Sequence, residues 1–222
     1  MLVSSRIEHT NLKPDATQVD IERLCREAAE YKFAGVCVNP KWVSFCADRL
    51  QNTKVYVCTV VGFPLGANMS AVKGFEAAEA VIQGAKHVDM VVDIGALKDG
   101  DAQRVLFDIA WVRSKIPRPT ILKVILEICL LTDEQIKWGC EAAQHAEADF
   151  VKTSTGFSTA GATIEHVRLM SQYGMKVKAA GGIRDYTTAM AMVEAGADIL
   201  GCSSSVAIAA EEQKFETRFS SL

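Results

Sequence analysis

The sequence lacks the features that define several large classes of protein. No apolar run reaches the roughly 18 residues that a membrane-spanning helix needs, and residues 1–10 carry no basic region followed by an apolar core, so no secretory signal is expected. The net charge is only −3 over 222 residues, which gives no reason to expect nucleic acid or an anionic membrane as a partner. We therefore expect a cytoplasmic protein.

Paired cysteines and paired metal ligands are also absent. The seven cysteines form no C-x-x-C pair, and most are expected to be small buried side chains in a reducing compartment. The four histidines show no H-x-x-x-H spacing. Neither a Gly-rich dinucleotide fingerprint after the first strand nor a phosphate-binding P-loop occurs. The sequence therefore favours an enzyme that uses no metal and no cofactor.

The chain does contain a regular alternation of two patterns, β-branched runs and amphipathic stretches. The β-branched runs predict strands at residues 6–10, 34–39, 54–62, 87–95, 120–128, 150–156, 176–181 and 199–203. The amphipathic stretches predict helices at residues 19–31, 41–50, 71–83, 101–115, 133–147, 164–173 and 186–195, with a last helix from about residue 206. Capping residues support two of the helix starts, Thr132 with Gln135 and Asp185 before Tyr186.

Strict alternation of eight strands with eight helices predicts a parallel sheet. Eight such units in a chain of 222 residues fit a closed barrel better than an open doubly wound sheet. No linker or shift in composition divides the chain. Residues 1–222 are therefore expected to form a single-domain α/β protein, a (β/α)8 TIM barrel.

Polar residues interrupt the predicted strands, and a barrel of this kind places its active groups at the carboxyl ends of those strands. The interrupting residues are Asn39, Asp89, Asp93, Lys123, Glu127, Lys152, Ser154 and Lys178. A barrel interior normally holds Val, Ile and Leu, and charges buried there must pair. Several of these side chains are therefore expected to converge in one polar pocket.

Two of the interrupting residues are lysines on neighbouring strands, Lys152 and Lys178. An amine attacks a carbonyl only when it is neutral, and burial or a second cation nearby favours loss of its proton. The pair indicates a Schiff-base nucleophile, although a lone lysine more often extends along a sheet edge into solvent. Asp89 either exchanges protons with the pair through water or only neutralises one lysine.

Small residues follow the last two predicted strands, Gly181-Gly182 and the Gly-Cys-Ser-Ser-Ser segment at residues 201–205. A helix follows each of them, and backbone N–H groups at a helix start bind anions when small residues allow close approach. A Gly-Gly pair alone serves any turn. The phosphate site of a TIM barrel lies at these same loops, so we expect a phosphomonoester to bind here.

Seven motifs, spread in order over nearly the whole chain, resemble the deoxyribose-phosphate aldolase family. They are Ile7-Glu8-His9-Thr10, Val36-Cys37-Val38-Asn39-Pro40, Val61-Gly62-Phe63-Pro64-Leu65-Gly66, Val88-Asp89-Met90-Val91, Leu122-Lys123-Val124-Ile125-Leu126-Glu127, the Phe-Val-Lys-Thr-Ser-Thr-Gly-Phe segment at residues 150–157 and Lys178-Ala179-Ala180-Gly181-Gly182. The third and sixth motifs are highly specific in combination.

The resemblance implies a class I aldolase that reversibly cleaves 2-deoxy-D-ribose 5-phosphate to D-glyceraldehyde 3-phosphate and acetaldehyde in deoxyribonucleotide catabolism. By motif, Lys152 matches the Schiff-base lysine, Lys178 the second lysine that lowers its pKa, and Asp89 the proton donor or acceptor. The positions that match substrate-pocket or phosphate-binding residues are Cys37, Lys123, Thr155, Gly156, Gly181, Gly182, Ser203 and Ser204. Family members are often dimers or tetramers, so a homo-oligomer is expected.

The chain departs from the family's usual residues in places that bear on rate, phosphate contact and closure by the tail. Glu8 stands where Asp is common, Asn11 where Leu or Thr is common, Asp93 for Asn, Ile199 for Arg and Cys202 for Thr or Ala, and the tail ends in Ser-Ser-Leu where some members end in tyrosine. The two lysines and Asp89 are intact. The alternatives are another Schiff-base aldolase or an isomerase acting on a sugar phosphate, or an inactive barrel kept as an assembly or regulatory subunit.

Overall fold

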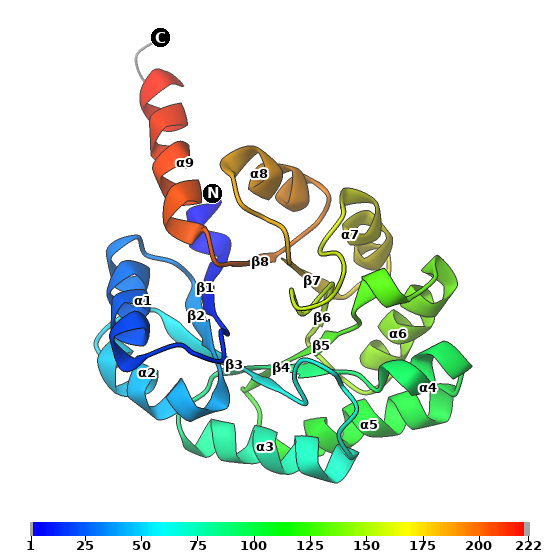
Figure 1. The fold of residues 1–222 in the computed structure, drawn as a ribbon. Coiled ribbons are helices and arrows are strands. Elements are labelled where there is room, and N and C mark those ends of the chain that lie inside the picture. The colour runs from blue at the N-terminus through cyan, green and yellow to red at the C-terminus, as the bar shows by residue number, and fades with distance from the viewer. Residues whose placement is uncertain (1, 220–222) are drawn as a thin grey trace.

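A computed structural model of the protein describes residues 2–219, and it is a closed barrel of parallel strands surrounded by helices (Figure 1). The tail at residues 220–222 lies outside the described residues. The strands are β1 (Ile7–Asn11), β2 (Gly35–Val38), β3 (Tyr56–Val61), β4 (His87–Val91), β5 (Ile121–Ile125), β6 (Phe150–Lys152), β7 (Lys176–Ala180) and β8 (Ile199–Cys202). Each strand pairs with its neighbour in sequence and β8 closes on β1, which confirms the predicted TIM barrel.

The helices follow the strands around the outside of the barrel (Figure 1). They are α1 (Gln18–Glu30), α2 (Val43–Leu50), α3 (Ser70–Ile82), α4 (Ile94–Asp99), α5 (Ala102–Lys115), α6 (Asp133–His145), α7 (Ile164–Ser171), α8 (Tyr186–Glu194) and α9 (Ser205–Phe219), with short 3-10 helices η1 (Ser4–Arg6), η2 (Pro40–Trp42) and η3 (Ile128–Leu130). Both predicted helix starts are confirmed: Thr132 forms a capping box with Gln135, and Asp185 accepts a hydrogen bond from the Thr188 N–H. No described helix is both long and apolar enough to cross a membrane.

The prediction of strict alternation is wrong after β4, where two helices, α4 and α5, precede the next strand. The strand predicted to reach residue 95 ends at Val91. Asp93 accounts for the early end, because its side chain accepts a hydrogen bond from the Ala96 N–H and caps α4. Gly100 then ends this short helix with a positive φ of 74°, which glycine adopts at little cost. The apolar residues at 88–94 therefore look like one strand in the sequence, although a helix begins at Ile94.

Buried apolar side chains form two separate clusters, and the side of the strands on which each lies shows which residues point into the barrel. The main core lies between the barrel and its helices and contains the outward-facing residues of the strands, such as Val88, Val151 and Val177. A smaller apolar cluster of Leu12, Cys37, Cys58 and Val60 forms apart from this core. Since side chains alternate between the two faces of a strand, the residues next to Val88, Val151 and Val177 point into the barrel.

Candidate active site

Five charged side chains meet inside the barrel, each contributed by a different strand. They are Glu8 of β1, Asp89 of β4, Lys123 of β5, Lys152 of β6 and Lys178 of β7, and none is more than 2% exposed. The strand register brings them together, since Lys152 is the register partner of Lys178 and Asp89 is that of Lys123. The polar pocket expected from the sequence is therefore present in the barrel, and all three residues expected to be catalytic belong to it.

Asp89 accepts hydrogen bonds from all three lysines. Its Oδ2 atom lies 2.8 Å from Lys152 Nζ and 2.6 Å from Lys178 Nζ. Its Oδ1 atom lies 2.9 Å from Lys123 Nζ and 3.2 Å from the Cys58 thiol. Such crowding around one carboxylate is tolerable in a buried site because every contact is charge-assisted or hydrogen-bonded.

Glu8 is a second carboxylate in the cluster, and sequence reasoning did not assign it a role. Its Oε2 accepts a hydrogen bond from Lys178. Its Oε1 lies 2.9 Å from Lys123 Nζ and 3.0 Å from the Tyr56 hydroxyl. The strand periodicity of two could have found it, because an acidic residue within an apolar strand must point either to the barrel interior or to the helices, and in both places it needs a partner.

The charges of four members of the cluster balance. Burial alone would lower the pKa of Lys178, but attraction to Asp89 and Glu8 raises it well above its ordinary value, and the same balance raises the pKa of Lys123. Burial alone would raise the pKa of Asp89 and of Glu8, but the lysines lower both well below the ordinary range. Two cations thus face two anions at neutral pH, and Lys152 contacts one of these carboxylates, Asp89.

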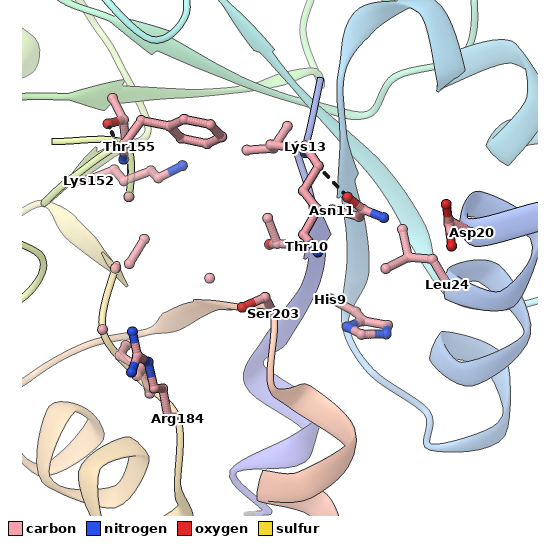
Figure 2. A pocket seen from close by; sticks show the side chains of 18 of the residues that line it. His9, Thr10, Asn11, Lys13, Asp20, Leu24, Lys152, Thr155, Arg184 and Ser203 are labelled. Atoms are coloured by element: carbon pink, nitrogen blue, oxygen red, sulfur yellow. Dashed lines mark hydrogen bonds between the residues drawn. The ribbon is translucent and has the colours of Figure 1, made fainter. Parts of the chain in front are cut away.

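A cavity of about 490 Å³ opens at the carboxyl ends of the strands, above the cluster. Lys152 is the member of the cluster that lines it (Figure 2), and the other cationic lining residues are Lys13, Arg23 and Arg184. The predicted binding residues that line the cavity are Thr155, Gly156, Gly181, Gly182 and Ser203. Three other predicted binding residues, Cys37, Lys123 and Ser204, are not among the described lining residues. Cys37 and Lys123 are fully buried instead.

The loops after β6 and β7 line the cavity with glycines, which have no side chain to cover their backbone. Gly156, Gly181 and Gly182 have φ values of 84°, 88° and 83°, a region that side chains rarely adopt. No heavy atom lies within 4 Å of the place where a side chain of Gly182 would begin. This open space leaves room for a ligand to contact the backbone directly. Arg184, two residues further on, was missed by the sequence reasoning, although continuing the Gly-Gly motif by two residues would have found it.

The Thr155 hydroxyl, expected to bind substrate, is engaged within the protein. It donates to Glu127 Oε2 and accepts from the Phe157 N–H at 3.0 Å. The Thr155 N–H also donates to Glu127 Oε1, at 3.2 Å. Glu127 is 2% exposed and lies after β5. This geometry holds the loop after Lys152 in place, so Thr155 shapes the cavity wall while its hydroxyl is occupied.

Glu8, Cys37, Cys58 and Asp89 have ligand atoms within 4.8 Å of one another, which is close enough for a metal ion. The donor set does not suit one. Lys123 and Lys178 already donate to both carboxylates, and their positive charges would repel a cation at the same place.

Comparisons with known proteins agree with this geometry. The family described as DeoC/LacD family aldolase matches residues 5–210. A deoxyribose-phosphate aldolase of Clostridium tetani is 50% identical over 96% of this chain and 100% of its own length, and one of Carboxydothermus hydrogenoformans is 54% identical over 93% of each. A solved tetrameric deoxyribose phosphate aldolase from Aeropyrum pernix matches with a TM-score of 0.87 and 33% identity, over 96% of this chain and 92% of that one. A parallel barrel with three lysines around one aspartate, matched over nearly its whole length by these proteins, is thus a member of the DeoC/LacD aldolase family.

Proposed function

We propose that this protein is a class I aldolase that reversibly cleaves 2-deoxy-D-ribose 5-phosphate to D-glyceraldehyde 3-phosphate and acetaldehyde through a Schiff base on Lys152, in deoxyribonucleotide catabolism. One observation carries the assignment to Lys152. Among the described lysines of the buried cluster, it is the one that reaches the cavity. Lys123 and Lys178 are each held by both carboxylates, Asp89 and Glu8, whereas Lys152 pairs with Asp89 alone. The Lys152 amine is therefore the one placed to attack a substrate carbonyl.

The reaction follows from this arrangement. The Lys152 amine adds to the C1 aldehyde of the open-chain sugar, and loss of water gives a protonated imine. The C3 hydroxyl then loses its proton, the C2–C3 bond breaks, and its electron pair moves into the imine to give an enamine and free glyceraldehyde phosphate. Protonation at C2 and hydrolysis release acetaldehyde and restore the amine. No cofactor is required.

Asp89 and Lys178 are proposed to move protons during these steps. Asp89 Oδ2 contacts the Nζ atoms of both Lys152 and Lys178, so a proton can pass between the reacting nitrogen and its neighbours over one hydrogen bond. Lys123 and Glu8 keep the cluster electrically balanced while Lys152 changes its charge. Lys123 therefore acts from beneath the cavity as a positioning residue.

The phosphate is proposed to bind at the end of the cavity formed by the loops after β6, β7 and β8. The supporting features are the backbone of Gly156, Gly181 and Gly182, the Ser203–Ser204 segment before α9, and the cations of Arg184 and Lys13. The N–H groups at the start of α9 favour an anion, and an arginine can bind phosphate through two parallel hydrogen bonds. The cavity volume of about 490 Å³ falls in the range of small-molecule sites.

Borohydride trapping tests the proposal. Incubation with deoxyribose 5-phosphate and borohydride, followed by peptide mass mapping, should find a reduced adduct on the peptide that carries Lys152. Lys152→Ala should lose the adduct and nearly all turnover while its circular dichroism stays unchanged. An adduct found only on Lys123 or Lys178 contradicts the assignment, and turnover without any adduct favours an isomerase. No turnover and no adduct would favour an inactive barrel subunit.

We further propose that the protein is a cytoplasmic homo-oligomer, a dimer or a tetramer. Large apolar side chains are exposed at the neighbouring helices α3 and α5: Met69 just before α3, Phe75 and Ile82 within it, and Phe107 in α5. Contiguous exposed apolar surface commonly marks a protein interface. Sedimentation equilibrium of the protein and of Phe75→Lys should show a multimer that the substitution weakens, and a monomer at all concentrations would contradict the proposal.

A further inference from the structure

His9 lies next to Glu8 in β1 but faces the opposite way, toward the helices. Its Nε2 atom is 2.8 Å from Glu27 Oε2 of α1, and its Nδ1 atom is 3.0 Å from the Ser205 Oγ atom at the start of α9. Figure 2 shows the ring beside β1, on the side of the cavity where Ser203 lies. His9 is only 4% exposed and Ser205 is fully buried. These three side chains therefore connect two helices through one strand residue.

Ser205 closes the turn that contains the proposed phosphate-binding serines. Its hydroxyl lies 2.9 Å from the carbonyl oxygen of Cys202, three residues earlier. Cys202 ends β8 and is the register partner of His9 in the barrel. The segment Ser203–Ser204 is thus bounded on one side by a strand paired with the backbone of His9, and on the other by a hydroxyl that contacts the ring of His9.

The burial of His9 favours a neutral imidazole. Burial lowers the pKa of His9 below its ordinary value, which outweighs the opposite effect of Glu27. A neutral ring has one donor and one acceptor nitrogen. With the proton on Nε2, facing the Glu27 carboxylate, Nδ1 is an acceptor, and the single proton of the Ser205 hydroxyl is shared between Nδ1 and the Cys202 carbonyl oxygen. Glu27 thereby fixes the ring, and the ring fixes Ser205.

The arrangement of a serine, a histidine and an acid is also that of a hydrolase triad. That role does not suit these residues, because Ser205 has no exposed surface and no substrate carbonyl can reach it. A role in holding the loop remains.

We infer that His9 is a positioning residue for the phosphate end of the cavity, holding the Ser203–Ser204 segment in the conformation that binds the phosphate group. The inference rests on the proposed function, since it deepens the assignment of that segment. Its ligand is the phosphate monoester of the substrate, and inorganic phosphate serves as the probe.

Two substitutions separate the two contacts of the ring. In His9→Gln the terminal amide lies near the position of Nε2 and keeps the contact with Glu27 but loses Ser205. In His9→Asn the terminal amide lies near the position of Nδ1 and keeps the contact with Ser205. Ser205→Ala removes the same contact from the other side, together with the contact of the Ser205 hydroxyl with the Cys202 carbonyl oxygen. His166→Gln is the matched control, because His166 also joins a hydroxyl (Thr163, 3.0 Å) to a carboxylate (Asp133, 3.3 Å), at the start of α7.

The measurements are kcat and KM for deoxyribose 5-phosphate and for unphosphorylated deoxyribose, and inhibition by inorganic phosphate. For His9→Gln and Ser205→Ala we expect the KM for the phosphorylated sugar and the inhibition constant of phosphate to rise about tenfold, the effect of one buried hydrogen bond. Activity on deoxyribose should be unchanged. His9→Asn should recover most of the phosphate affinity, and His166→Gln should resemble the unmodified protein.

Three results would overturn the inference: equal losses on both sugars, an Asn variant as impaired as the Gln variant, or phosphate affinity unchanged in Ser205→Ala. If His9→Gln does not fold, Ser205→Ala, which removes a single oxygen atom, still tests the contact, because phosphate affinity unchanged in it overturns the inference, and the comparison with His9→Asn then assigns the effect to His9. Failure of the proposed function looks different. In that case the unmodified protein neither cleaves deoxyribose 5-phosphate nor binds inorganic phosphate, whereas failure of this inference alone leaves both intact and insensitive to the variants.

Discussion

Lys152 and Lys178 donate to the same oxygen atom, Oδ2 of Asp89, with Nζ–O distances of 2.8 and 2.6 Å. The two lysines are register partners on adjacent strands, so the barrel itself sets the separation of their amines. Lys178 has a second carboxylate, Glu8, and Lys152 has none. The same oxygen therefore contacts one amine that a second carboxylate also holds and one amine that reaches the cavity.

Replacing Lys178 should move the activity profile to higher pH. Lys178→Leu leaves Lys123 and Lys152 as the two amines that face Glu8 and Asp89, so the two carboxylates then favour the protonated form of the Lys152 amine. The lower limb of the plot of kcat/KM against pH should rise by roughly one to three pH units, the usual effect of a close charge, and the rate at neutral pH should fall. Lys178→Arg keeps the charge but cannot exchange protons readily, and should restore the pH optimum without the rate. An unchanged profile in Lys178→Leu would contradict this electrostatic role.

Glu8 should stabilise the folded protein only above a certain pH. Glu8→Gln leaves the buried Lys123 and Lys178 with too little negative charge, and breaking such a buried pair costs about 3–5 kcal/mol. Because the pKa of Glu8 is lowered on folding, its contribution is complete above the unfolded value of about 4.3 and is lost as pH falls through the lower, folded value. Urea unfolding should show a large difference between the two proteins at pH 7 that narrows in acid. Glu134→Gln, on the exposed start of α6, is the control; a difference that does not change with pH would count against the cluster as its source.

Arg184 should bind phosphate rather than take part in the chemistry. Arg184→Gln removes a cation from the cavity, and loss of a hydrogen bond to a charged group is worth about 1.5–3 kcal/mol, or roughly 10- to 150-fold in KM for deoxyribose 5-phosphate. The kcat for unphosphorylated deoxyribose should stay the same. Arg168→Gln, on the exposed side of α7, should have no effect on either substrate. A fall in kcat on both substrates would place Arg184 among the reacting groups instead.

A methyl group at Gly201 should disturb Lys178. Its Cβ atom would lie 3.1 Å from Lys178 Cε and 3.0 Å from Ala180 Cβ, closer than most real contacts. We expect Gly201→Ala to lower kcat and to destabilise the fold by about 1–3 kcal/mol, the usual cost of overpacking. Gly95→Ala, in helix α4 with its nearest atom 3.4 Å away, is the matched substitution, and calorimetry should show little change in its Tm. Full activity in Gly201→Ala would mean that Lys178 has room to move.

Chelation should leave activity unchanged. The carboxylates nearest the reacting amine already accept hydrogen bonds from lysines, so no step is expected to depend on a metal ion. Turnover assays before and after dialysis against a strong chelator test this, and activity lost on chelation and regained with zinc would refute the imine mechanism.

The parts of the site that could be predicted from sequence are those encoded within single strands. The twofold periodicity of a strand predicts that Lys152, Lys178 and Asp89 point into the barrel. The same periodicity marks Glu8 as a buried acid, but its partners depend on the closure of β8 against β1 and on a lysine 170 positions away. Likewise, Arg184 follows directly from the Gly-Gly motif, but its place in one cavity with the segment after β8 comes from the three-dimensional structure.

The fold could be predicted because its repeating units are also encoded locally. The errors lie where one side-chain hydrogen bond overrides the structural preference of the neighbouring residues. Eight repeated units indicate a barrel whatever the details of each unit. At Asp93 a capping side chain overrode the strand preference of the neighbouring apolar residues. At Thr155 the hydroxyl looks available in the sequence, but the buried Glu127 brought near by β5 takes it.

Strand β6 has only three residues, and the last of them is Lys152. In an open sheet so short a strand would fray, but here each of its residues has a partner on β5 and on β7. The barrel therefore anchors the nucleophile through its neighbours and leaves the chain free to turn away immediately after it. Substitutions that adapt this protein to bulkier aldehydes are therefore expected in residues 153–163. The shape of this segment can change while the Lys152 amine stays in place.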